Sequence, residues 1–392
     1  MGNIKHHKVF LLAVSYGVLV ASIRTSLIHL HIGYNPVDYG VYKNVSSLLQ
    51  HGLSIYDNDA IGTYVEQGLP FVYTPFSAII LYPLGYFPEP LGVFTWTFLN
   101  AILLFYIVKI SINDISGIKI FLFSLIFSSF NIIAQHFMFG QINIILCFLC
   151  LYDLLRKNIK VLPRGILIGI AAGIKLTPAL FIAFFLFSKR WKYFIYSSIS
   201  FLITVIIGFL FTPHNTVEYF TSKIFNLSSV VDLGQNFSTS GNSSIQGVIS
   251  RWTGNHDSAL VALLSLFVIS ISFIAASRLL QLGDYLAVAS IIGVASCLLS
   301  PVSWLHHWVW AVPSIIWLLR STRQLFKIPL AVAWSLVCMV QGTDLGDYLA
   351  SVGAPLLFYE FFRSSLVLCG ILWIIYMFAN TTRRILNNKT GL

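Results

Sequence analysis

The chain has 392 residues, of which 57% are hydrophobic and 10% are charged, and its mean hydropathy is +0.81. A soluble domain carries roughly 25% charged residues, so this composition excludes an ordinary soluble protein. The formal net charge of +10 does not indicate nucleic-acid binding, because the lysines and arginines form short clusters between apolar runs, which is a membrane topology signal.

Apolar runs of membrane-crossing length recur along the chain, since a crossing helix needs about 20 mostly apolar residues. The first run begins at Val9 after a basic segment and has no clear small-residue cleavage site, so we expect an uncleaved first helix. We predict an all-α polytopic membrane protein with about twelve transmembrane helices in a single domain over residues 1–392. The predicted crossings lie near residues 9–30, 91–108, 118–135, 141–155, 165–174, 178–187, 192–212, 257–278, 283–300, 305–319, 328–341 and 356–380.

The basic clusters predict which connections stay in the cytoplasm. They place both termini inside, in a multi-pass protein of the cell membrane. Three long connections, 31–75, 213–256 and 342–355, are poor in lysine and arginine and are expected to face outward. The clusters are Lys5/Lys8, Arg156/Lys157/Lys160/Arg164, Lys189/Arg190/Lys192, Arg320/Arg323/Lys327 and Arg383/Arg384.

Two segments depart from simple crossings. Residues 71–88 are interrupted by Pro75, Pro83 and Pro88 and are interpreted as re-entrant, because a full crossing there would break the parity of the termini. The runs 165–174 and 178–187 are short for two full crossings. We interpret this pair as a broken helical hairpin that lines a cavity.

Ionisable side chains are costly inside a bilayer and therefore indicate function. Asp38 follows the first helix closely, and Lys175 lies between the two halves of the predicted hairpin. Each also has a structural interpretation, as a helix cap after Pro36 for Asp38 and as a snorkelling side chain for Lys175. Asp57-Asn58-Asp59 has the form of a metal-binding motif, but we expect a turn in an outer loop and predict no metal site.

Six motifs then follow in order along the chain. They are Asp38-Tyr39-Gly40-Val41-Tyr42, Phe71-Val72-Tyr73-Thr74-Pro75, Gly140-Gln141-Ile142-Asn143, Gly173-Ile174-Lys175-Leu176-Thr177-Pro178, Asn242-Ser243-Ser244 and Ser300-Pro301-Val302-Ser303-Trp304-Leu305-His306-His307. Together they resemble glycosyltransferase family 87 over roughly residues 34–310.

The resemblance implies a C-type glycosyltransferase fold and a mannose donor carried on polyprenyl phosphate, with transfer at the outer face. It implies an α-1,2 linkage to a lipid-linked glycan of the phosphatidylinositol mannoside or lipomannan type, and no cofactor besides the donor as co-substrate. The expected partners are that donor, the glycolipid acceptor and membrane lipids, without nucleic acid.

Inverting transfer needs a base at the acceptor hydroxyl, and Asp38 is the candidate. The leaving phosphate needs positive charge or fixed hydrogen-bond donors. Adjacent helical positions point about 100° apart, so we expect one histidine of the His306/His307 pair to face the cavity, with His307 preferred. The predicted donor-phosphate or substrate contacts are Lys175, His306, His307, Arg251, Gln141, Asn143, Asn242, Ser244, Tyr42 and Tyr73.

Two interpretations remain beside the enzyme. A secondary transporter is also polytopic with broken helices, although such transporters commonly show repeated halves and we find no second copy of the Asp38 loop or the Lys175 hairpin. A lipid flippase is the other alternative, and it would not need a carboxylate at the outer mouth.

Overall fold

The computed structural model describes residues 2–56, 59–62, 64–112, 115–156, 162–226, 237–254, 258–320 and 327–390. Each predicted crossing coincides with one helix or with two consecutive helices. These are α1 (Gly2–His29), α4 (Glu89–Ser111), α5 (Gly117–Ser128) with α6 (Asn131–Phe139), α7 (Asn143–Leu155), α8 (Ile166–Ile174), α9 (Ala179–Phe187), α10 (Trp191–Phe211), α14 (Ser258–Gln281), α15 (Tyr285–Leu299), η3 (Leu305–Trp310) with α16 (Ala311–Leu319), α17 (Lys327–Met339), and α19 (Leu356–Arg363) with α20 (Ser365–Thr390).

The chain is an all-α polytopic membrane protein, as the composition predicted. Within the described ranges, five helices are long and apolar enough to cross a membrane, or up to seven if each of two bent helix pairs is one crossing. The pair α5 and α6 is bent by 79°. Helix length therefore does not establish the predicted number of twelve.

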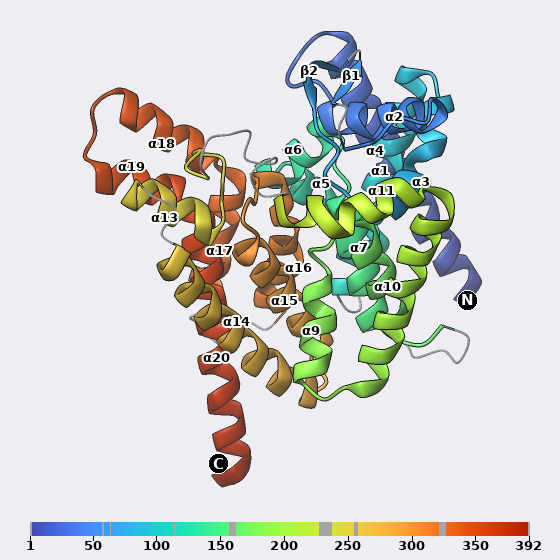
Figure 1. Cartoon of the computed structure of the whole chain (residues 1–392). Coiled ribbons are helices and arrows are strands. Elements are labelled where there is room, and N and C mark those ends of the chain that lie inside the picture. The colour runs from blue at the N-terminus through green and yellow to red at the C-terminus, as the bar shows by residue number, and fades with distance from the viewer. Residues whose placement is uncertain are drawn as a thin grey trace.

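The three connections expected to face outward hold short helices rather than irregular loops. The first contains α2 (Val37–Gln50) and an antiparallel hairpin of β1 (Ala60–Gly62) and β2 (Val65–Leu69). The second contains α11 (Pro213–Glu218), the π-helix η2 (Tyr219–Lys223) and α13 (Ile245–Thr253), and the third contains α18 (Gly342–Ser351). These elements gather toward the top of Figure 1, and the C-terminus lies at the bottom.

The segment interpreted as re-entrant forms α3 (Pro75–Leu81) and the 3₁₀-helix η1 (Tyr82–Tyr86). Thr74 begins α3, because its side chain accepts a hydrogen bond from the Ser77 backbone N–H at 3.3 Å. The same hydroxyl donates to the Gly173 carbonyl at the end of α8. The start of α3 is therefore bonded to the end of α8, which is the first half of the predicted helical hairpin.

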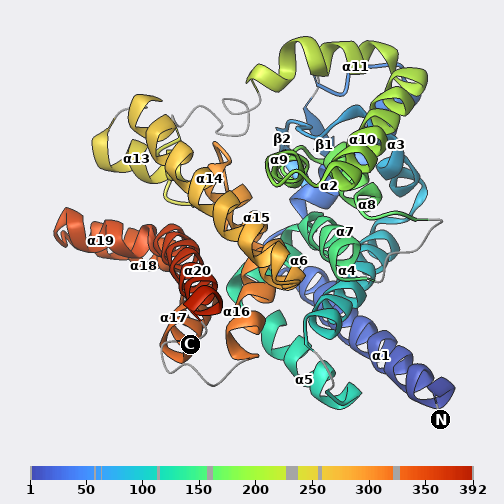
Figure 2. The same ribbon diagram turned by 90° about the horizontal axis from the view of Figure 1, so that it is seen from below.

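Helix α15 is the centre of the bundle, since its residues from Leu286 to Leu298 are all buried. It packs between α7 on one side and α20 on the other (Figure 2). Helices α10 and α14 instead expose large apolar side chains such as Leu210 and Leu263. Apolar side chains on the outside of a bundle face lipid, so the fold has a polar interior region and an apolar belt.

Candidate active site

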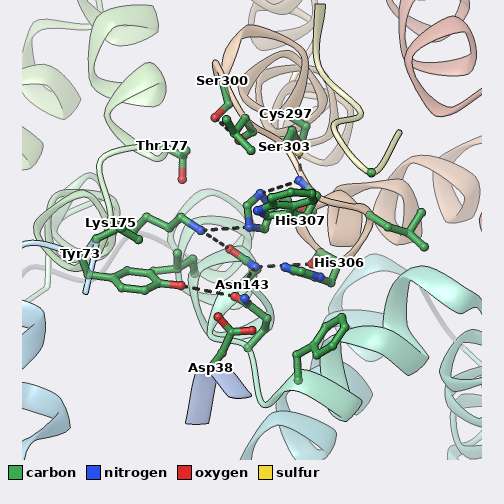
Figure 3. A pocket seen from close by; sticks show the side chains of 18 of the residues that line it. Asp38, Tyr73, Asn143, Lys175, Thr177, Cys297, Ser300, Ser303, His306 and His307 are labelled. Atoms are coloured by element: carbon green, nitrogen blue, oxygen red, sulfur yellow. Dashed lines mark hydrogen bonds between the residues drawn. The ribbon is translucent and has the colours of Figure 1, made fainter. Parts of the chain in front are cut away.

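A cavity of about 980 Å³ opens beside the first turn of α2. Its walls come from α2, residues 69–73, the α6–α7 connection, the α8–α9 connection, residues 300–307 and the start of α18. Of the described residues that line it, Lys175 is the one lysine or arginine. Figure 3 shows Asp38, Lys175 and His307 turned toward the same space.

Asp38 lies in the first turn of α2 and is half-buried in the cavity wall. The α6–α7 connection packs closely against the first turn of α2 because residue 140 is a glycine. Its φ is +74°, and a Cβ there would lie 2.7 Å from the Cβ of Tyr39. Burial raises the pKa of the Asp38 carboxyl to about 6, although a hydrogen bond from Gln141 and the charge of Lys175 act in the opposite direction. A carboxylate of this pKa is ionised at neutral pH and can accept a proton.

Lys175 stands at the tip of a helical hairpin. Gly165 lies against the Tyr193 backbone, and Gly173 lies against the Thr204 side chain. These contacts follow the same order along both helices, so α8 lies beside α10 and runs in the same direction. Because a tight turn joins α9 to α10, α9 runs back antiparallel to α8. Each half has nine residues, or about 14 Å of helix, which is half of a bilayer core of about 30 Å.

The Lys175 ammonium contacts two polar side chains and one ring. Its Nζ donates to the Oδ1 atom of Asn143 at 3.2 Å and lies 3.5 Å from the Nε2 atom of His307. It also lies 5.1 Å from the centre of the Tyr73 ring. The Lys175 side chain is thereby held toward the cavity.

The hydrogen bonds of His307 fix its tautomer. Its Nδ1 atom accepts from the Trp304 backbone N–H at 3.3 Å, so a neutral ring carries its proton on Nε2. The Nε2–H group and the Lys175 ammonium are then both donors, and their nitrogens lie 3.5 Å apart in the lining of the cavity. Two donors so placed form a site for an anionic oxygen.

A chain of hydrogen bonds orients the amide beside Asp38. The Oε1 atom of Gln141 accepts from the Asn143 amide at 3.1 Å and from the Tyr73 hydroxyl at 3.4 Å. The hydroxyl of Tyr42 lies 2.8 Å from that of Tyr73. With Oε1 occupied in this way, the Gln141 amide nitrogen is directed to the Asp38 carboxylate.

Both histidines line the cavity, although one was expected to do so. They belong to a 3₁₀-helix, and the two rings meet edge to face at 4.9 Å. Within the described ranges neither ring nitrogen of His306 has a hydrogen-bond partner, and its ring packs on Phe139 at 5.2 Å. Its role in binding stays a prediction.

The structure places Asn242, Ser244 and Arg251 behind the cavity wall. Asn242 donates to the Pro301 carbonyl at 3.1 Å and accepts from the Ser303 N–H at 3.0 Å, and the Ser244 hydroxyl donates to the same carbonyl at 3.1 Å. These bonds hold the loop that leads to the histidines. Arg251 donates to the Asn242 carbonyl at 2.9 Å and pairs with Glu360 at 2.9 Å. Direct substrate contact by these three residues remains a prediction.

Sequence reasoning missed Arg24, which is buried in the first helix. It donates to the carbonyls of Tyr34 at 2.7 Å and Met138 at 2.5 Å, and so ties the chain before Asp38 to the end of α6. A charge inside the first apolar run was the signal that could have identified it. It also missed a second group of polar lining residues: Gln135, Gln341, Thr343 and Asp344.

The described residues contain no group of three or more metal-ligating His, Cys, Asp or Glu side chains. Asp57 and Asn58 of the motif that resembled a metal site lie outside the described residues. The prediction that the reaction needs no metal is not tested by this observation.

Comparisons with known proteins agree with the motifs in the sequence. The profile of glycosyltransferase family 87 matches residues 71–301. Asp38, His306 and His307 lie outside that segment, so their roles rest on the geometry described above. No solved structure matches the chain.

Curated relatives match over a longer range. A polyprenol-phosphate-mannose-dependent alpha-(1-2)-phosphatidylinositol pentamannoside mannosyltransferase of Mycobacterium tuberculosis is 31% identical over 299 residues, covering 73% of this chain and 67% of that protein. The Mycolicibacterium smegmatis protein of the same description is 29% identical, with 81% and 78% covered. A phosphatidylinositol mannoside mannosyltransferase of M. tuberculosis with the same type of donor is 26% identical, with 72% and 70% covered.

Proposed function

Because the chain belongs to glycosyltransferase family 87, and is therefore a glycosyltransferase, we propose that it transfers mannose from polyprenyl-phosphate-mannose to a phosphatidylinositol mannoside-type glycolipid in an α-1,2 linkage. The observation that carries the proposal is the convergence of a carboxylate, Asp38, and two cavity-facing donors, Lys175 and His307, on one cavity. A transporter or flippase, the alternatives to an enzyme, has no support from the family match.

Asp38 acts as the general base. The acceptor hydroxyl oxygen forms a bond to the anomeric carbon of mannose as the bond from that carbon to the phosphate oxygen breaks. The hydroxyl proton goes to the Asp38 carboxylate, and the electron pair of the broken bond leaves with polyprenyl phosphate. A single displacement inverts the anomeric carbon, so an α product requires a β-linked donor.

Lys175 and His307 bind the donor phosphate. Negative charge grows on the phosphate as the glycosidic bond breaks, and the two donors already point at one position before the substrate arrives. Preorganised donors of this kind stabilise developing charge without reorganisation during the reaction. Asn143 holds Lys175 in place by accepting a hydrogen bond from its ammonium group.

The reaction takes place at the outer face, with both termini in the cytoplasm. Basic connections such as Arg156–Arg164 and Lys189–Lys192 favour the cytoplasmic side by the positive-inside rule. Helices α2 and α18, which contribute to the cavity wall, belong to the opposite group of connections. A polyprenyl donor suits this location because its lipid chain stays in the membrane while the sugar reaches the cavity.

The test is transfer by the purified chain in lipid nanodiscs. Polyprenyl-phosphate-mannose labelled in the sugar and a phosphatidylinositol mannoside acceptor are supplied, and the linkage of the product is read by NMR. The proposal predicts one added mannose, α-1,2-linked, and released polyprenyl phosphate. Labelled donor that is left unchanged, or a product with another linkage, would contradict it.

A further inference from the structure

A second polar cluster lines the cavity where α6 meets the α17–α18 connection. The Oε1 atom of Gln341 accepts from Asn131 at 2.6 Å and from Gln135 at 2.9 Å, and its amide nitrogen donates to the Oδ1 atom of Asp344. Gln135, Gln341, Thr343 and Asp344 all line the cavity. Two elements about 200 residues apart in sequence thus form one oriented network.

The network leaves polar atoms available to a ligand. The Gln341 oxygen accepts two hydrogen bonds, and the described contacts do not use the Oε1 atom of Gln135, the Oδ2 atom of Asp344 or the Thr343 hydroxyl. Gln135 and Thr343 are buried against the cavity, with 7% and 8% of their surface exposed. Their polar atoms line the cavity, so the arrangement favours a ligand that donates hydrogen bonds to them.

The composition of the cluster identifies the kind of ligand. The cluster offers a carboxylate, amides and a hydroxyl, which match the neutral hydroxyls of a ligand. Lys175, the one lysine or arginine of the described lining, lies instead beside His307. A phosphate or another anionic headgroup would meet Asp344 without a compensating charge. A sugar, with several hydroxyls on one face, fits both the donors and the acceptors present.

The end of α6 connects the polar cluster to the Asp38 site. Gln135 and Phe139 are separated by about 6 Å of helix, and Gln141, which contacts Asp38, follows directly after Gly140. Gln135, Phe139 and Gln141 all line the same cavity, so one acceptor can reach both groups. The rings of Phe139 and Tyr34, 5.2 Å apart, also line the cavity and offer an apolar surface to a sugar ring.

We propose that Gln135, Thr343 and Asp344 form an acceptor subsite that binds the sugar next to the one receiving mannose. The proposal rests on the proposed transferase function and adds a determinant of acceptor length. Gln341 is a positioning residue in it, because its amide orients Gln135 and Asp344. Acceptors with a second sugar then gain binding energy that single-sugar acceptors lack.

The experiment compares two acceptors, an alkyl α-mannoside and an alkyl α-mannobioside, with polyprenyl-phosphate-mannose as donor. Asp344→Ala removes an exposed carboxylate, and Gln135→Leu removes a buried amide. Ser351→Ala on the same helix is the matched control, since its hydroxyl bonds to the Tyr348 carbonyl outside the cavity lining. Initial rates give KM and kcat for each acceptor.

We expect each variant to raise the KM for the mannobioside on the order of tenfold, with kcat little changed and the KM for the mannoside unaltered. The control should match wild type on both acceptors. Equal effects on the two acceptors, or none on either, would overturn the subsite while wild-type transfer upheld the proposed function. Wild type that uses a phosphatidylinositol mannoside but neither alkyl glycoside would overturn the subsite alone, and wild type that transfers mannose to none of the three would overturn both.

Discussion

Two groups of charged side chains lie near the same end of the molecule and differ in their partners. In the Arg251 group, Glu360 bonds both Arg251 at 2.9 Å and Arg363 at 2.8 Å, and Arg363 also pairs with Asp347. Around Asp38, the Lys175 ammonium and the His307 ring instead face a cavity. A buried charge with a complete set of partners supports structure, whereas a charge directed at open volume is available to substrate.

The comparison predicts its largest effect on activity at Lys175. Lys175→Met removes one of the two donors that face the phosphate, and we expect kcat to fall roughly 100-fold to 1000-fold while the protein stays folded. Lys189→Met, at the exposed turn between α9 and α10, is the control and should keep wild-type activity. Steady-state transfer rates decide, and near-normal turnover of Lys175→Met would show that the cavity cation does not serve the leaving group.

Arg251→Met should act on stability instead. It leaves Glu360 buried with Arg363 as its remaining partner, which we expect to lower the free energy of unfolding by about 1–3 kcal/mol. Adding Glu360→Leu should recover part of that loss, and thermal unfolding in detergent measures both variants. A stable Arg251→Met protein that binds acceptor poorly would instead support the substrate contact predicted from the sequence.

The pH dependence tests the state of Asp38. A base works when ionised, and the pKa of Asp38 is raised to about 6, so kcat/KM should fall about tenfold per unit below this pH. The measurement is kcat/KM between pH 4.5 and 8 with stability checked at each point. A rate that stays constant down to pH 4.5 would contradict a base of this pKa.

Gln141→Leu gives a smaller and more specific effect. The Gln141 amide stabilises the ionised form of Asp38 by a hydrogen bond, so its removal should raise the pKa and move the acid limb of the profile to higher pH. The shift is read from the same rate profile. Ser129→Ala, whose exposed hydroxyl bonds to the Ile126 carbonyl outside the cavity lining, is the control and should leave that limb at the wild-type position.

Much of the cavity wall around Asp38 was predictable because polar residues are rare in apolar segments. Asp38, Gln141, Lys175 and His307 stand out for this reason, and the structure brings them to one cavity. The hairpin at Lys175 was also predictable, since two nine-residue helices are short for full crossings. The family motifs identified these positions, but the tautomer of His307 depends on a backbone contact that the sequence does not show.

Other features required tertiary packing. The meeting of Gln135 with Gln341 depends on how α6 lies against α17, and nothing in either segment indicates the other. Arg251 was interpreted as a substrate contact because its partner Glu360 lies 109 residues away. The connections that are expected to face outward looked like loops by composition, whereas α2 forms a helix by burying Tyr39 and Tyr42 on one side.

Mannose transfer by Asp38→Asn tests the central claim most directly. The asparagine side chain keeps the size of aspartate and one acceptor oxygen but cannot take up the proton of the acceptor hydroxyl at neutral pH. We predict normal folding and donor binding with product formation reduced by roughly 100-fold to 10,000-fold. Turnover within a few fold of wild type would contradict the account, because the cavity would then have lost its proposed base without losing its reaction.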